Sequence, residues 1–247
     1  MEMGVVIEVK HVNKSFGSNH VLRDFSMEVQ QGENLAILGK SGSGKSVLIK
    51  CIINLIQADS GQIVVLGEDI SLLDQEELDA LRAKVGFLFQ SNALYDSMTV
   101  RENLLFPLRR HWTKEQRLLS AESAVMEALE DVGLAHTIDM MPAELSGGMR
   151  KRIALARTLI LKPQVILYDE PTTGLDPITS REISELMVSV QKKYNATGVI
   201  ISHDLNCIKI TANRVVMLID GKNYACDTLE NLQQIEDPKV QEFFKAL

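Results

Sequence analysis

An eight-residue stretch, "GKSGSGKS" (Gly39 to Ser46), has the spacing G-x-x-x-x-G-K-[ST] of a phosphate-binding loop. In such a loop the backbone N–H groups converge on phosphate oxygens, and the following helix adds its positive end. Lys45 would reach the β- and γ-phosphates, and the Ser46 hydroxyl would bind Mg²⁺. The alternative is a flexible glycine turn, but an apolar run precedes the loop and a helical pattern follows it. The predicted nucleotide-binding residues here are Gly39, Lys40, Ser41, Gly42, Ser43, Gly44, Lys45 and Ser46.

Two adjacent acids, Asp169 and Glu170, end the apolar run "VILYDE". At the carboxyl end of a strand, Asp169 can hold Mg²⁺ through water. Successive side chains of a strand point to opposite sides, so Glu170 is available to orient or deprotonate an attacking water. A lone Asp-Glu pair is more often a solvated strand end. The phosphate loop makes the catalytic interpretation the better one.

A second glycine pair lies in "AELSGGMRKRIALAR" (Ala143 to Arg157), where Ser146, Gly147 and Gly148 introduce a helical pattern. Free N–H groups at a helix start make a second anion site. One bound nucleotide does not need two such sites in one chain, so the second site requires its own explanation.

Composition limits the classes of partner. The chain has 247 residues, is 45% hydrophobic and carries a net charge of -7, which argues against nucleic acid as the main partner. Its three cysteines form no C-x-x-C pair, which fits a reducing cytosol. The start "MEMGVVIEVK" shows no signal-peptide pattern, and no run approaches the roughly 18 apolar residues of a membrane span. We therefore expect the chain to stay out of the bilayer.

Two kinds of strand pattern indicate an α/β fold. Residues 5–9 and 25–29 alternate apolar with polar residues, as half-buried strands do. Residues 34–39, 164–170 and 198–203 contain continuous apolar runs, which are typical of a parallel sheet covered on both faces. Residues 214–225 predict a hairpin that turns at Asp220-Gly221.

The middle third of the chain is helical in pattern. Asp74 with Glu77, and Thr113 with Gln116, form the spacing of capping boxes. After the second box, one helical face is expected to carry Leu118, Ala121, Val125, Leu129 and Val132. This pattern predicts a helical insertion between two strands of the sheet.

The chain resembles ABC-transporter ATPase subunits over nearly its whole length. Six motifs occur in the family's order: "GKSGSGKS", "FLFQ" ending in Gln90, "LSGGM" at 145–149, "VILYDE", "GLDP" at 174–177, and "ISHD" with His203. The resemblance implies a P-loop NTPase fold of ABC type, with a mostly parallel core sheet, an N-terminal antiparallel β-subdomain and an inserted α-helical subdomain. It also implies one domain over 1–247: core and β-subdomain at about 1–90 and 164–230, helices at about 91–160, and a helical tail at about 231–247.

The resemblance answers the question of the second anion site. In that family two subunits pack head to tail, and ATP lies between one phosphate loop and the other subunit's signature. Ser146, Gly147 and Gly148 would therefore serve the partner's nucleotide, and Asp176 would lie at the dimer interface. Met149 replaces the commoner glutamine, which puts the adenosine-side contacts in doubt.

Further site residues follow from the same resemblance. Phe16 would stack on adenine, Gln90 would contact Mg²⁺ and the membrane partner's coupling helix, and His203 would contact the γ-phosphate. The implied catalytic residues are Glu170, His203 and Lys45, and the implied Mg²⁺ ligands are Ser46, Gln90 and Asp169. The implied partners are a second copy of the chain and integral membrane permease subunits, at the cytoplasmic face of a bacterial inner membrane.

A narrower resemblance, to the ATPases of Mla/Mce-type phospholipid transporters, is carried by residues 87–109, by "ELSGGMRKRIALAR" and by "DEPTTGLDPIT". It adds a lipid-binding MCE protein as an expected partner. The alternative is an importer of amino acids or other small polar solutes. A non-transport ABC ATPase fits less well because the insertion is short and each motif occurs once. A non-enzymatic regulator is disfavoured by Glu170 and His203.

Overall fold

Two sheets form the framework of the computed structural model, which describes residues 4–245. The antiparallel sheet has the order β2 (Asn19–Gln30), β1 (Val5–Phe16), β4 (Ser60–Val65), β5 (Glu68–Asp69). The core sheet has the order β10 (Lys222–Asp227), β9 (Arg214–Ile219), β3 (Asn34–Leu38), β8 (Thr197–Ser202), β7 (Val165–Asp169), β6 (Val85–Leu88). Its neighbours are parallel except β9 and β10.

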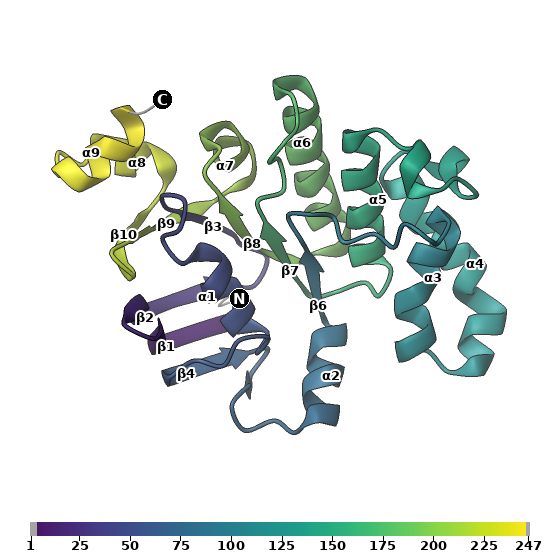
Figure 1. Cartoon of the computed structure of the whole chain (residues 1–247), viewed down its shortest axis with the longest axis horizontal. Coiled ribbons are helices and arrows are strands. Elements are labelled where there is room, and N and C mark those ends of the chain that lie inside the picture. The colour runs from purple at the N-terminus through teal and green to yellow at the C-terminus, as the bar shows by residue number, and fades with distance from the viewer. Residues whose placement is uncertain (1–3, 246–247) are drawn as a thin grey trace.

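Helices join and cover these strands (Figure 1). They are α1 (Lys45–Ile52), α2 (Gln75–Ala83), α3 (Val100–His111), α4 (Lys114–Asp131), α5 (Gly147–Leu159), α6 (Pro177–Tyr194), α7 (Leu205–Thr211), α8 (Leu229–Gln234) and α9 (Pro238–Lys245). Single 3₁₀ turns at Ala135–Thr137 and Pro142–Glu144 precede α5. Helices α3 and α4 extend beyond α5 at one end of the molecule, and α8 and α9 lie at the other (Figure 1). The predicted combination of antiparallel sheet, mostly parallel core sheet and helical insertion is confirmed.

Strand alternation sorts the core into layers. In β3, Leu35 and Ile37 pack with α1 and the antiparallel sheet, whereas Ala36 and Leu38 pack with α8 and α9. In β7 the same alternation sends Leu167 toward α1 and the antiparallel sheet, and the residues beside it toward α5 and α6. Both faces of the core sheet are buried at β3, β7 and β8, which explains the continuous apolar runs in the sequence.

The parallel strands bring distant loops to one edge of the sheet. The carboxyl ends of β3, β6, β7 and β8 lead directly to the phosphate loop, Gln90, Glu170 and His203. In open α/β sheets this is the edge where ligands bind. Sheet order, rather than sequence distance, therefore determines which side chains meet.

Local signals in the sequence predict the turns and helix starts well. Both capping boxes form, at Asp74 and at Thr113. The hairpin turns at Asp220 and Gly221, with φ of 51° and 78°, as a two-residue type I′ turn requires. The expected apolar face of α4 is wrong at Leu118, which is 77% exposed, because the buried residues of α4 begin only at Ala121.

The C-terminal tail packs on its own domain. Val240 is buried against the α8 side of the core sheet, and Phe243 packs beside it. Glu242 Oε1 accepts a hydrogen bond from Lys40 Nζ at 2.7 Å, which ties α9 to the phosphate loop. The last two residues of the predicted tail, and the first three of the N-terminal segment, lie outside the described residues.

Two leucines of α4 test this packing. Leu129 is fully buried, so we expect Leu129→Ala to lower the free energy of unfolding by about 2–5 kcal/mol through lost burial and a cavity. Leu118→Ala should change it by less than about 0.5 kcal/mol. Equilibrium urea unfolding measures both. Equal losses at the two positions would contradict the described orientation of α4.

Candidate active site

A cleft of about 470 Å³ at the carboxyl edge of the core sheet gathers most of the predicted site residues. Its lining comes from the end of β1, the start of β2, the phosphate loop, the start of α1, and the loops after β6, β7 and β8. The lining residues are Phe16, Val21, Ser41, Gly42, Gly44, Lys45, Ser46, Val47, Gln90, Glu170 and His203.

The phosphate loop is shaped to receive an anion. Lys45 is 6% exposed, and its Nζ donates to the carbonyl oxygens of Gly39 at 2.7 Å and Lys40 at 3.1 Å. Burial lowers the pKa of Lys45, and the charges of Glu170 and Asp169 oppose that shift. The Ser43 hydroxyl is buried without a hydrogen-bond partner within the described chain. Phosphate oxygens in the cleft are acceptors that the Lys45 ammonium can take beside these two carbonyls.

Backbone geometry explains why the loop needs glycine at particular places. Gly44 has φ of 104°, and a Cβ there would lie 2.7 Å from Val21 Cγ1. Gly39 leaves room for Ser43, since a Cβ would approach its Oγ to 2.5 Å. These positions let the loop curl tightly against β2 and the start of α1.

Ser46 and Asp169 meet although 123 residues separate them. Ser46 Oγ donates to Asp169 Oδ1 at 2.9 Å, and burial is the largest cause of a raised Asp169 pKa. A hydroxyl and a carboxylate beside bound phosphate are the hard oxygen ligands that Mg²⁺ prefers. The donor set therefore fits that ion.

Glu170 lines the cleft, whereas Asp169 does not. Its Oε2 lies 2.8 Å from His203 Nδ1 and accepts from the Thr173 hydroxyl at 3.3 Å, and its Oε1 lies 3.7 Å from Lys45 Nζ. Its φ of 50° is uncommon for a residue other than glycine. The 2.9 Å hydrogen bond from its N–H to the carbonyl of Ile201 in β8 helps to hold that geometry.

Phe16 and Gln90 stand at the rim. Phe16 is 50% exposed, and Lys14 Nζ lies 5.2 Å from its ring centroid. An exposed ring beside the phosphate loop has a free face for a planar base. Gln90 is also exposed and lines the same cleft.

The signature residues lie elsewhere. Ser146 is the N-cap of α5, and its Oγ accepts from the N–H of Met149 at 3.2 Å. Ser146 and Gly147 are exposed, and neither they nor Gly148 line the cleft around Lys45. A Cβ on Gly148 would lie 2.7 Å from Thr179 Cγ2, so α5 sits close against the start of α6.

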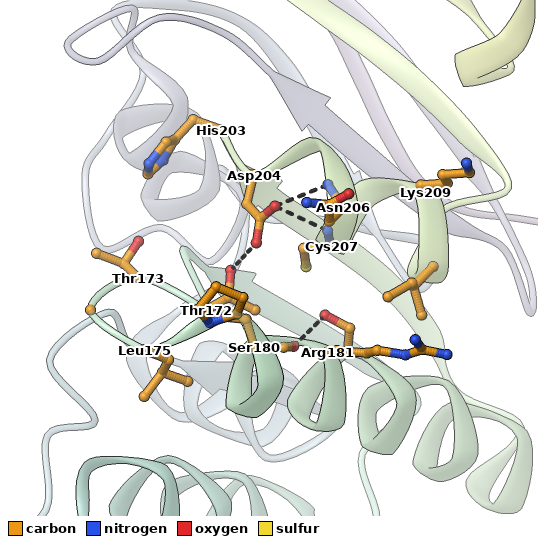
Figure 2. Close-up of a pocket in the computed structure, with 14 residues that line it drawn as sticks. Thr172, Thr173, Leu175, Ser180, Arg181, His203, Asp204, Asn206, Cys207 and Lys209 are labelled. Carbon is orange, nitrogen blue, oxygen red and sulfur yellow. Dashed lines mark hydrogen bonds between the residues drawn. The ribbon is translucent and has the colours of Figure 1, made fainter. Parts of the chain in front are cut away.

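A second cavity, of about 760 Å³, lies between α6 and α7 beside the first. Figure 2 shows His203, which lines both cavities, and the hydrogen bond from the Thr172 hydroxyl to Asp204 (3.1 Å). Asp204 also caps α7. Asp176 caps α6 in the same way, and bonds from Thr179 lower its pKa. The loops after β7 and β8 are thus fixed by caps.

Sequence reasoning missed two basic residues of α5. Lys151 is 2% exposed and donates to the carbonyl of Gln90 at 3.1 Å; burial lowers its pKa to about 8. Arg157 donates to the carbonyls of Asn92 and Ala93. A signal was present, because Lys151 lies on the face of α5 that also carries the buried Ala154 and Leu155.

Fold and site together define a phosphate-loop nucleotide-binding α/β protein. The family model described as "ABC transporter" matches residues 22–173, which is more than half of the chain. The chain therefore belongs to the ABC transporter ATP-binding family: it is an ATP-binding subunit of an ABC transporter and hydrolyses ATP. No helix within residues 4–245 is long and apolar enough to cross a membrane.

Relatives and solved structures support this assignment. The chain is 40% identical to the probable ribonucleotide transport ATP-binding protein Mkl of Mycobacterium leprae, covering all of this chain and 70% of that protein. It is 37% identical to the intermembrane phospholipid transport ATP-binding protein MlaF of Haemophilus influenzae (98% and 90% covered). It is 39% identical to the methionine import protein MetN of Rhizobium johnstonii (88% and 59% covered). It resembles the dimeric, ADP- and phosphate-bound ATP-binding cassette MJ0796 with a TM-score of 0.80 at 30% identity, covering 90% and 98%.

Glu170→Gln tests the arrangement of the cleft. The amide keeps the size of the side chain but cannot take a proton, so we expect turnover to fall by about 10²–10⁴-fold. ATP binding should stay within about threefold, because the phosphate contacts remain. Turnover is measured by phosphate release and binding by a fluorescent ATP analogue. Glu115→Gln, at an exposed position of α4, is the control. If Glu170→Gln hydrolysed ATP at the parental rate, Glu170 would not be the catalytic base.

Proposed function

We propose that two copies of this chain pack head to tail and drive phospholipid movement between membranes through a permease. The observation that carries the dimer is the separation of two anion sites: Lys45 lies in the cleft, whereas Ser146 lies on an exposed helix start outside it. Each chain thus has half of two composite sites. The dimeric state of the similar cassette MJ0796 supports this arrangement.

The phosphate loop binds and orients the triphosphate. Lys45 exchanges its two loop carbonyls for phosphate oxygens, which are stronger acceptors because they are charged. Ser46, Asp169 and Gln90 would hold Mg²⁺, and the ion would neutralise charge on the phosphates. Phe16 offers its exposed ring to the adenine.

Glu170 and His203 act at the γ-phosphate. Glu170 orients the attacking water and accepts its proton as the oxygen–phosphorus bond forms and the bond to ADP breaks. His203 lies against Glu170 Oε2 at 2.8 Å, so it can hold that carboxylate in place while its ring contacts the phosphate.

Ser146 completes the partner's site. Its oxygen already accepts from the Met149 N–H, so its own hydrogen is available to donate to a γ-phosphate. The N–H groups of Gly147 and Gly148 and the positive end of α5 add to this attraction. Loss of the γ-phosphate removes what both chains share, and the dimer reopens.

Two variants that are inactive alone test the head-to-tail arrangement. Lys45→Ala removes the phosphate contact, and Ser146→Arg blocks the partner's site while leaving ATP binding by its own monomer intact. Because half of the dimers in an equal mixture are mixed and each holds one complete site, we expect about a quarter of the parental ATPase activity to return. A mixture that stays inactive, or loss of ATP binding by the Ser146→Arg monomer, would contradict the arrangement.

The phospholipid assignment is supported by the length of the match and not by identity, which is 37% to MlaF, 40% to Mkl and 39% to MetN. The match to MlaF spans 98% of this chain and 90% of that protein, whereas the matches to two MetN proteins span 59% and 75% of the methionine importers. The Mkl relative is named for ribonucleotide transport, so a small polar substrate is the competing function. The helical insertion supplies only α3, α4 and α5, which disfavours a non-transport role that uses a long coiled coil.

The permease would dock beside Gln90. Tyr95 and Phe106 are 42% and 40% exposed, and their ring centroids lie 4.8 Å apart. Exposed aromatic pairs are frequent anchors at protein interfaces. This surface would place the chain at the cytoplasmic face of a bacterial inner membrane, with an MCE lipid-binding protein in the same complex.

Lipid analysis of the assembled complex tests the substrate. We expect phospholipid to copurify with it above the amount carried by an unrelated membrane complex from the same cells, and to stimulate its ATPase activity. The measurements are mass spectrometry of extracted lipid and phosphate release in nanodiscs. Stimulation by methionine or a ribonucleotide, with lipid at the background level, would establish the competing function.

A further inference from the structure

Helix α5 is tied to the loop that follows β6, and the first of these contacts is at Gln90. Lys151 lies in the second turn of α5, its side chain is 2% exposed, and its Nζ donates to the Gln90 carbonyl at 3.1 Å. The charge of Asp169 also acts on this ammonium. The contact joins the helix that begins with the signature to the loop whose glutamine lines the nucleotide cleft.

A second tie lies further along the same helix. Arg157 donates from Nη2 to the Asn92 carbonyl at 3.0 Å and from Nη1 to the Ala93 carbonyl at 2.8 Å. Asn92 and Ala93 are both left-handed, with φ of 65° and 53°. Neighbouring non-glycine residues keep such conformations only where their surroundings fix them.

These contacts are an inefficient way to stabilise a core. A buried ammonium loses its hydration, and a single carbonyl replaces little of it, so an apolar side chain at 151 would pack at lower cost. The charge of Lys151 is therefore better explained by its effect on the position of the Gln90 loop than by a contribution to the stability of the core.

We propose that Lys151 and Arg157 are positioning residues that make residues 90–93 move as one body with helix α5. This inference rests on the proposed function, in which Gln90 contacts Mg²⁺ and the permease. The signature at the start of α5 engages the partner's nucleotide, and the two ties carry any displacement of α5 directly to Gln90. One rigid unit would then join the partner's nucleotide, this chain's own Mg²⁺ and the docking surface beside Tyr95.

Hydrogen exchange of the ligand-free full chain tests the ties without any need for activity. We expect Lys151→Met and Arg157→Met to raise amide exchange in peptides covering 88–95 by about tenfold, with exchange in α5 unchanged. Lys162→Met, which removes only an exposed pair with Glu127, is the matched control. Unchanged exchange in 88–95, or an equal rise throughout α5, would overturn the proposal.

Kinetics test what the ties do. In Lys151→Met we expect kcat to fall by about tenfold and the half-saturating Mg²⁺ concentration to rise, with ATP binding within about twofold of the parent. Lys151→Arg, which keeps a donor, should restore both. Two results for Lys151→Met would overturn the positioning role. One is an unchanged kcat and Mg²⁺ dependence although amide exchange in residues 88–95 has risen, and the other is loss of ATP binding.

Gln90→Ala separates this inference from the function on which it rests. We expect it to reproduce the Mg²⁺ dependence of Lys151→Met. If Gln90→Ala leaves the Mg²⁺ dependence unchanged, Gln90 does not contact Mg²⁺, and Lys151 cannot act by positioning it. The hydrogen-exchange measurement is independent of this result, and it still decides whether Lys151 and Arg157 hold residues 90–93 to α5.

Discussion

The buried ammonium of Lys45 is the constraint on which this site depends. Lys45 sits at the carboxyl edge of the core sheet, where two carbonyls of its own loop accept hydrogen bonds from it and the charges of Glu170 and Asp169 act on it. The glycines keep the loop tight enough to hold it there, and sheet order brings Asp169 and Glu170 to the same edge. A bound triphosphate would add charged acceptors for this ammonium beside the two carbonyls.

The second anion site extends that logic to a partner. Ser146 Oγ accepts one hydrogen bond and keeps its own hydrogen, on an exposed helix start that does not line the cleft of its own chain. A hydroxyl in this position can donate to a charged group supplied by a second chain. The same helix is tied to the loop beside Tyr95, so in the proposed dimer a displacement of α5 would reach the surface proposed for a permease.

Sequence predicts the parts of this molecule that local chemistry controls. A few adjacent residues determine the glycine loop, the capping boxes and the Asp220-Gly221 turn. Unbroken apolar runs in the sequence predict the buried strands. What sequence could not give depends on tertiary neighbours. Leu118 fits the helical period of the apolar face but is exposed, and Lys151 is charged but buried. The hydrogen bond between Lys40 and Glu242 joins residues 202 apart in the sequence, so no local pattern predicts it.

A crystal structure of the chain with Mg²⁺ and a non-hydrolysable ATP analogue would show whether each nucleotide is bound by one chain or by two. We predict a head-to-tail dimer in which Ser146 Oγ lies about 3 Å from a γ-phosphate oxygen. The Lys45 that binds the same phosphate would belong to the other protomer. A γ-phosphate contacted by Ser146 and Lys45 of one chain, or a Ser146 that faces only solvent with nucleotide bound, would contradict it.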